Sequence, residues 1–176
     1  MMIAGICPIL SGLRNSTPTS RGFFEPSKSE LLMKPTPLAD IGLLLIRLGT
    51  GICFIFIHGL AKLTGGPERW EGLGKSMENI GITFLPVVWG FLAAFAETFG
   101  ALFLAAGFMF RTSSFMLGFT MFVAMMVHLG RLDPWGRVAH PMELMFVFFG
   151  LMLIGPGRYS IDHWLRSRAL RSDDKA

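Results

Sequence analysis

The sequence predicts an all-α protein, a bundle of four transmembrane helices with short amphipathic helices at the membrane surfaces. Two observations carry this prediction. Hydrophobic residues make up 52% of the 176 residues and charged residues only 16%, whereas about a quarter of a typical water-soluble domain is charged. The charges also crowd into the two termini and three short connections, and they almost vanish from the stretches between. One domain is the natural count for this length.

Four apolar stretches are long enough to cross the hydrocarbon core of a bilayer, which is about 30 Å thick and needs about 20 helical residues. They are residues 41–63, 85–110, 113–129 and 140–157, of which the third and fourth are the shortest. The alternative is a set of buried helices in a water-soluble protein. Such helices would need polar faces that these stretches lack.

Two further segments have the pattern of short amphipathic helices. The first begins near Pro67 and repeats apolar residues at helical spacing: Trp70, Leu73, Met77 and Ile80. The second follows Ser160 and contains Ile161, Trp164 and Leu165. We expect the first to lie on the outer membrane face and the second at the inner face.

The chain divides into three parts by composition. Residues 1–37 are rich in Pro, Ser and Thr and lack a sustained apolar period, which predicts a disordered tail. Residues 38–165 form the predicted transmembrane domain, and residues 166–176 a basic cytoplasmic tail. Met33 lies just before the first apolar stretch and could be the true start of the protein.

Lysines and arginines are distributed unevenly about the four stretches. The N-terminal segment, the connection between the second and third stretches and the C-terminal tail hold ten of them, and the other two connections hold five. The positive-inside rule then predicts a multi-pass protein with both termini in the cytoplasm. The cations flank apolar runs and form no basic patch interleaved with aromatic residues, which argues against nucleic-acid binding and for contact with membrane lipid.

Apart from Lys62, which is counted with the connection that follows, the ionisable residues inside the apolar stretches are Arg47, His58, Glu97, His128, His140 and Glu143. A charge at mid-bilayer costs at least about 2.5–3.5 kcal/mol on insertion scales, so such residues normally face the bundle interior and have partners. Glu97 shares its helical face with small residues: Gly90, Ala93, Ala94, Gly100 and Ala101. Small residues allow helices to approach closely, so we expect Glu97 to point into the bundle.

The functional interpretation of this group is a proton-coupled or quinone-binding pocket. Its catalytic candidates are Glu97, His58 and Glu143, and its quinone-binding candidates are Arg47, His58, His128 and His140. An imidazole can exchange a hydrogen bond with a quinone carbonyl, while Phe and Met side chains pack against the ring. The structural alternative is that Arg47 and Glu97 merely pair to fix helix register, across a depth difference of roughly 8 Å that a long Arg side chain can bridge.

A metal site is a further alternative. His140 and Glu143, three residues apart, could both act as ligands. The paired Glu-x-x-His repeats of carboxylate-bridged di-iron bundles are absent from the sequence, however, so no metal site is predicted.

Four segments, in order, resemble the DoxX family of four-helix bacterial membrane proteins. They are RLGTGICFIFIHGLAKL from Arg47, GGPERWEGLGKSMENIGI from Gly65, AETFGALFLAAGF from Ala96 and HPMELMFVFFGLMLIGPGRYSID from His140. The resemblance covers about residues 38–165 and implies a bacterial inner-membrane protein linked to redox physiology. The related DoxD subunit belongs to a membrane thiosulfate:quinone oxidoreductase. The positions that match the family pattern are Arg47, His58, Glu97, Glu143 and Asp162.

The leading hypothesis is a small membrane subunit of a quinone-linked oxidoreductase, which takes electrons from a redox partner subunit and hands them to a quinone. The alternative is a non-enzymatic membrane anchor or assembly component of a redox complex. A transporter is less well supported because the sequence shows neither an inverted repeat nor a pair of broken helices.

Overall fold

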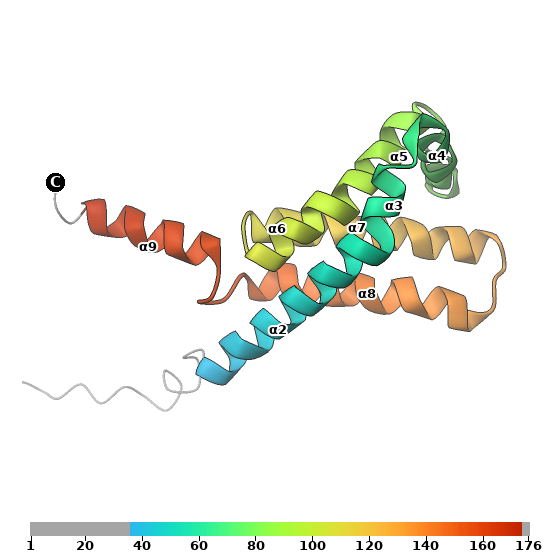
Figure 1. Ribbon diagram of the computed structural model, residues 1–176. Helices are drawn as coiled ribbons and strands as arrows, with labels where there is room; N and C mark the ends of the chain where they lie inside the picture. Colours follow the sequence, from blue (N-terminus) through green and yellow to red (C-terminus); the bar gives the residue numbers. More distant parts are fainter. Residues whose placement is uncertain (1–35, 174–176) are drawn as a thin grey trace, which may run out of the picture. The chain divides into compact units, whose positions relative to one another are not determined.

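The computed structural model describes residues 36–173, and within that range it contains helices and no strands (Figure 1). Four continuous helical segments are long and apolar enough to cross a membrane: Pro37–Leu63, Pro86–Ala106, Phe110–Gly130 and Trp135–Ile154. The predicted all-α fold with four spans is therefore confirmed.

The spans are built from the following elements. The first span consists of α2 (Pro37–Cys53), η1 (Phe54–Gly59) and α3 (Leu60–Leu63). The second consists of α5 (Pro86–Phe95), η3 (Ala96–Gly100) and α6 (Ala101–Ala106). The third and fourth are α7 (Phe110–Gly130) and α8 (Trp135–Ile154). Outside the spans lie α4 (Gly66–Gly74), η2 (Lys75–Ile80) and α9 (Ile161–Asp173).

Local signals explain where the first two spans begin and end. Pro37 and Pro86 each stand in the first turn of a helix, where a missing N–H costs nothing. The Thr36 hydroxyl accepts the N–H of Ala39 and caps the first span. Gly107 ends the second span with a φ of +67°, a left-handed conformation that glycine adopts without strain.

The interior of the bundle is an apolar cluster to which all four spans contribute. α7 and α8 run side by side over most of their length, and α2 packs against α6 (Figure 1). The buried members of the cluster are Phe54, Ala101, Leu104, Phe110, Leu117, Met121, Phe148 and Leu151. Alanines and glycines between the larger residues let the helices approach, and a Cβ at Gly51 would lie only 2.8 Å from that of Ala105.

The outside of the spans is as apolar as the inside. Large hydrophobic side chains such as Leu45, Phe56 and Leu153 are about two-thirds exposed or more. A water-soluble monomer rarely shows a continuous apolar surface of this kind, whereas a membrane-spanning bundle requires it. The chain is a multi-pass membrane protein whose spans contact lipid.

The connection between the first two spans folds back onto the second span. The Trp70 indole N–H donates to the carbonyl oxygen of Lys62 over 3.0 Å, and its ring lies edge-on to Phe91 at 5.0 Å. A Cβ at Gly90 would lie 1.7 Å from the Trp70 carbonyl oxygen, so only glycine allows α4 to sit this close to α5. The helical segment predicted to begin near Pro67 is thereby confirmed.

Arg47 joins three parts of the bundle although it is only 1% exposed. Its guanidinium donates to two carbonyls at the end of α6, those of Leu104 at 3.1 Å and Ala105 at 2.9 Å. It also donates to two carbonyls between α8 and α9, those of Pro156 at 2.7 Å and Tyr159 at 3.0 Å. Carbonyls at a helix C-terminus lack helical partners and carry partial negative charge, so a buried cation is stabilised there.

Two aspartates complete the same end of the bundle. Asp162 accepts the backbone N–H groups of Met109 and Phe110, at 3.0 and 2.9 Å, and so caps α7. Asp40 accepts the backbone N–H of Arg158 at 3.0 Å. The start of α2, the turn before α7 and the end of α8 therefore lie together, as an even number of spans requires.

Several boundaries differ from those predicted. The third and fourth spans contain 21 and 20 residues, more than their apolar cores suggested, because their helices begin earlier, at Phe110 and Trp135. Helix α9 continues to Asp173, into the predicted tail 166–176, because Arg, Ala and Leu favour helix. The predicted disordered segment 1–37, including Met33, lies almost wholly outside the described residues.

We expect Arg47→Met to lower the free energy of unfolding by at least about 3 kcal/mol, because four carbonyls lose a charged donor and hydrogen bonds to charged groups contribute about 1.5–3 kcal/mol each. Arg47→Lys should recover only part of this, because an ammonium cannot reproduce the planar fork of a guanidinium. Chemical unfolding in detergent measures both. Arg166→Met, on an exposed position of α9, is the control. Equal stability of Arg47→Met and the control would contradict the role given to Arg47.

Candidate functional site

Two wide π-helical turns face each other in the middle of the bundle. One is η1 in the first span and the other is η3 in the second, and they pack directly together. Gly59 makes the approach possible, since a Cβ there would lie 2.5 Å from the Thr98 hydroxyl oxygen and 2.8 Å from the Glu97 carbonyl oxygen. Each π turn inserts one extra residue into its helix, and such turns occur frequently at functional sites.

The two π turns bring an ion pair into the bundle. Glu97 lies in η3 with its side chain 3% exposed, and its carboxylate accepts a hydrogen bond from the Lys62 ammonium at 2.5 Å. Lys62 is 23% exposed and reaches inward from α3, four residues after His58 on the same face. A buried carboxylate without this partner would be strongly destabilising.

This ion pair forms one wall of a polar cavity of about 440 Å³, a volume within the range of about 300–1,000 Å³ that is usual for small-molecule sites. Its lining residues come from all four spans, and the fourth span contributes through the first half of α8. The lining residues are His58, Lys62, Glu97, Met121, Ala124, His128, Gly136, Arg137, His140, Pro141 and Leu144.

The rim of the polar cavity is held by a second charged group. The His128 Nδ1 lies 2.7 Å from the Asp133 carboxylate, and Arg137 lies 3.5 Å from the other carboxylate oxygen. The hydrogen bond with His128, and then the charge of Arg137, hold the pKa of Asp133 below its usual value. This contact fixes one ring nitrogen of His128 and leaves the other for the cavity.

An apolar groove adjoins the polar cavity. It has a volume of about 340 Å³ and lies between α2, η1 and α8. Its lining residues are Gly49, Thr50, Cys53, Phe54, Ile57, His58, His140 and Leu144. His58, His140 and Leu144 belong to both hollows, so a polar chamber and an apolar groove meet at two imidazoles.

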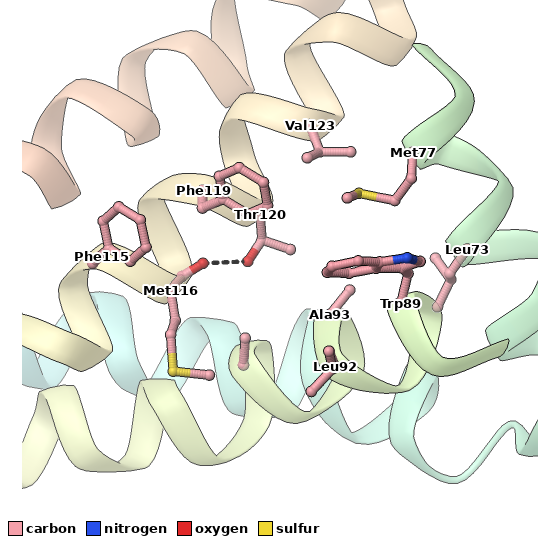
Figure 2. A pocket seen from close by; sticks show the side chains of 11 residues that line it. Leu73, Met77, Trp89, Leu92, Ala93, Phe115, Met116, Phe119, Thr120 and Val123 are labelled. Atoms are coloured by element: carbon pink, nitrogen blue, oxygen red, sulfur yellow. Dashed lines mark hydrogen bonds between the residues drawn. The ribbon is translucent and has the colours of Figure 1, made fainter. Parts of the chain in front are cut away.

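A third hollow is almost entirely apolar and lies under η2 between α5 and α7 (Figure 2). Its volume is about 190 Å³, and Trp89, Phe115 and Phe119 are among its walls. Thr120 is its one hydroxyl and donates to the Met116 carbonyl of its own helix at 2.6 Å (Figure 2). None of the described residues that line this hollow is titratable, in contrast to those of the polar cavity.

The structure brings together four of the six candidate residues. His58, Glu97, His128 and His140 all line the polar cavity. Arg47 and Glu143 do not: Arg47 is bound to carbonyls at the end of α6 and beyond α8, and Glu143 lies exposed on α8. The roles assigned to these residues stay predictions.

The structural alternative, in which Arg47 pairs with Glu97, is wrong. Arg47 binds backbone carbonyls, and Lys62 is the partner of Glu97. In the sequence, Lys62 was assigned to the connection after the first span. In the structure it is the next-to-last residue of that 27-residue span. The available signal was its position four residues after His58, which places both on one helical face.

Comparison with known proteins supports the resemblance found in the sequence. The family model described as DoxX matches residues 42–129, which is half of the 176 residues. The matched range contains Arg47, His58, Lys62, Glu97 and His128. No curated protein and no solved structure matches the chain.

We expect Lys62→Met to lower the free energy of unfolding by about 2 kcal/mol, less than the roughly 3–5 kcal/mol of a fully buried pair because Lys62 is partly exposed. The double variant Lys62→Met/Glu97→Gln should recover most of the loss, because it leaves no buried charge without a partner. Lys75→Met breaks an exposed pair with Glu71 and is the matched control. Additive losses in the double-mutant cycle would contradict the coupling.

Proposed function

Because this chain belongs to the DoxX family of membrane proteins, we propose that it is the small membrane subunit of a quinone-linked oxidoreductase. The single observation that carries the proposal is the junction of the polar cavity with the apolar groove. A quinone has the same two-part character, with a polar ring that carries two carbonyls and a long apolar tail. The cavity suits the ring and the groove, open to lipid, suits the tail.

The residues around the cavity supply what quinone chemistry needs from a protein. His58 and His140 stand where the two hollows meet and can donate hydrogen bonds to a ring carbonyl. The Phe54 ring lies 5.3 Å from the His58 ring and forms an apolar wall beside it. The Lys62–Glu97 pair can pass a proton between the cavity and these imidazoles, since one member is a donor and the other an acceptor.

The reaction balances with one external reductant. Reduction of the quinone to the quinol takes two electrons and two protons. In our proposal a redox partner subunit supplies both electrons. Both protons come from water through the side chains of the polar cavity, which regain them from the aqueous side where Arg137 and His128 stand at the rim.

We place the protein in the bacterial inner membrane with both termini in the cytoplasm. The start of α2 and the end of α8 lie together, and the sequence before α2 and after α8 holds more than half of the lysines and arginines. The polar cavity then opens toward the periplasmic side.

A second function, a non-enzymatic anchor or assembly component, is favoured by Glu143. This residue is exposed on α8, about 12 Å from the start of the helix at about 1.5 Å per residue. Its neighbours on the surface, Phe146 and Val147, are apolar and exposed. A carboxylate facing lipid at this depth is costly, so a polar group of another subunit should cover it.

Glu97→Gln should weaken binding of a short-chain quinone analogue roughly tenfold, because a neutral amide no longer holds Lys62 in place as a donor. Calorimetric titration of the purified full chain in detergent measures the dissociation constant. Glu71→Gln makes the same chemical change in the exposed pair with Lys75 and should leave binding unchanged. Absence of saturable binding to the unaltered protein would remove the proposal, as would equal binding by the Glu97→Gln protein.

Glu143→Leu separates the two functions. If a partner subunit covers Glu143, the variant should migrate at its own mass on native gels of gently solubilised membranes, while the unaltered chain migrates in a larger assembly. Binding of the quinone analogue to the isolated variant should not change, because Glu143 lies outside the polar cavity. Glu78→Leu, at an exposed position of η2, is the control. A variant that stays in the larger assembly would contradict a contact at Glu143.

A further inference from the structure

A cavity of about 370 Å³ lies at the opposite end of the molecule from the polar cavity, where α2 begins, α8 ends and α9 begins. It is independent of the proposed redox function. Its lining combines both signs of charge with apolar side chains: Ala39, Asp40, Leu43, Ile154, Pro156, Gly157, Arg158, Asp162, His163 and Arg166. Because the first and fourth spans terminate here, the cavity lies at the depth of the lipid headgroups.

The cavity is lined by a buried carboxylate, that of Asp40, which lacks a hydrogen-bond donor for one of its two oxygens within the described part of the chain. The residue is 4% exposed, and its Oδ1 accepts the N–H of Arg158 at 3.0 Å. Its Oδ2 is buried without a hydrogen-bond donor among residues 36–173, and the nearest cation, the Arg158 Nε, stands 3.5 Å away. A buried carboxylate oxygen without a donor is costly, and native structures rarely leave one so. Because Asp40 lines the cavity, an N–H donor bound there can approach this carboxylate.

The mouth of the cavity favours an anion, because cationic side chains line it. Arg158, His163 and Arg166 line it and are exposed. The other acid, Asp162, already uses both carboxylate oxygens to cap α7, so it does not compete for these cations. Guanidinium groups bind phosphate through charge-assisted, often bidentate hydrogen bonds.

The remaining part of the cavity lining is apolar. Leu43 and Ile154 form part of the cavity wall, and the Ile154 side chain is 69% exposed toward the lipid. Acyl chains attached to a headgroup in the cavity would run along this surface.

We propose that this cavity binds the headgroup of an ethanolamine phospholipid from the bilayer. The primary ammonium donates to the Oδ2 of Asp40, the phosphate lies against Arg158 and Arg166, and the acyl chains follow Leu43 and Ile154. A choline headgroup satisfies the phosphate site but has no N–H to donate. A glycerol headgroup has the phosphate and lacks the cation.

Lipid binding to the purified full chain tests the proposal without any substitution. Native mass spectrometry would compare short-chain phosphatidylethanolamine, its N-trimethylated counterpart phosphatidylcholine, and phosphatidylglycerol. The ethanolamine lipid should bind roughly tenfold more tightly than the choline lipid, because it adds one charged hydrogen bond in a buried site. Glycerophosphoethanolamine, which lacks acyl chains, should bind much more weakly than the intact lipid.

Two variants locate the effect. Asp40→Asn should abolish the preference for ethanolamine over choline, whereas Asp133→Asn, the same change at the other end of the bundle, should preserve it. Arg166→Gln, at an exposed position of α9, should weaken binding of all three lipids alike, by several-fold, and leave the fold intact. Equal affinity for ethanolamine and choline lipids in the unaltered protein would overturn the proposal. So would a full preference retained by Asp40→Asn, or full binding of the headgroup alone.

Discussion

The bundle depends on a buried cation that is held by backbone carbonyls. Arg47 is buried, and its four hydrogen bonds all go to backbone carbonyls, two at the end of the second span and two beyond the fourth. Every residue supplies a backbone carbonyl, whatever its side chain is. This contact therefore requires the helix ends to lie at particular positions but does not require particular side chains there. It holds the first span against the end of α6, and Asp162 and Asp40 then fix the neighbouring turns. One end of the molecule is thereby closed by backbone contacts.

The other end is organised by side chains and is looser. Lys62, His128 and His140 are all partly or largely exposed, and the hollow between them is open at its rim. Stability and chemistry are thus divided between the two ends. A rigid end allows the other to hold a charged cavity whose members retain freedom to move protons or admit a ligand, since functional elements usually belong to the less stable parts of a fold.

Sequence patterns were sufficient for the fold and for four of the residues that line the polar cavity, but they missed Lys62. Length and hydropathy gave the four spans, and the stripe of small residues beside Glu97 correctly placed that carboxylate inside the bundle. The partners of the buried charged side chains could not be predicted in the same way. A helical wheel assumes 3.6 residues per turn, which the π turns at His58 and Glu97 break. The partners of Arg47 are backbone carbonyls, which every residue has, so no pattern of side chains could identify them from the sequence. Glu143 lies three residues after His140, close to one helical turn, yet of the two only His140 lines the cavity.

The π turn in the first span has a consequence for how this chain can change in length. The wide turn absorbs one extra residue, because each of its residues advances around the helix axis by less than the roughly 100° of an α-helical residue. Deleting one residue from 54–59 would therefore let this turn revert to α-helix while the residues beyond it keep nearly the same angular position. Lys62 could then stay beside Glu97 while Arg47 keeps its carbonyls. A deletion in a regular α-helical span such as α7 has no such reserve, and it would rotate everything beyond it by about 100° and move it by about 1.5 Å.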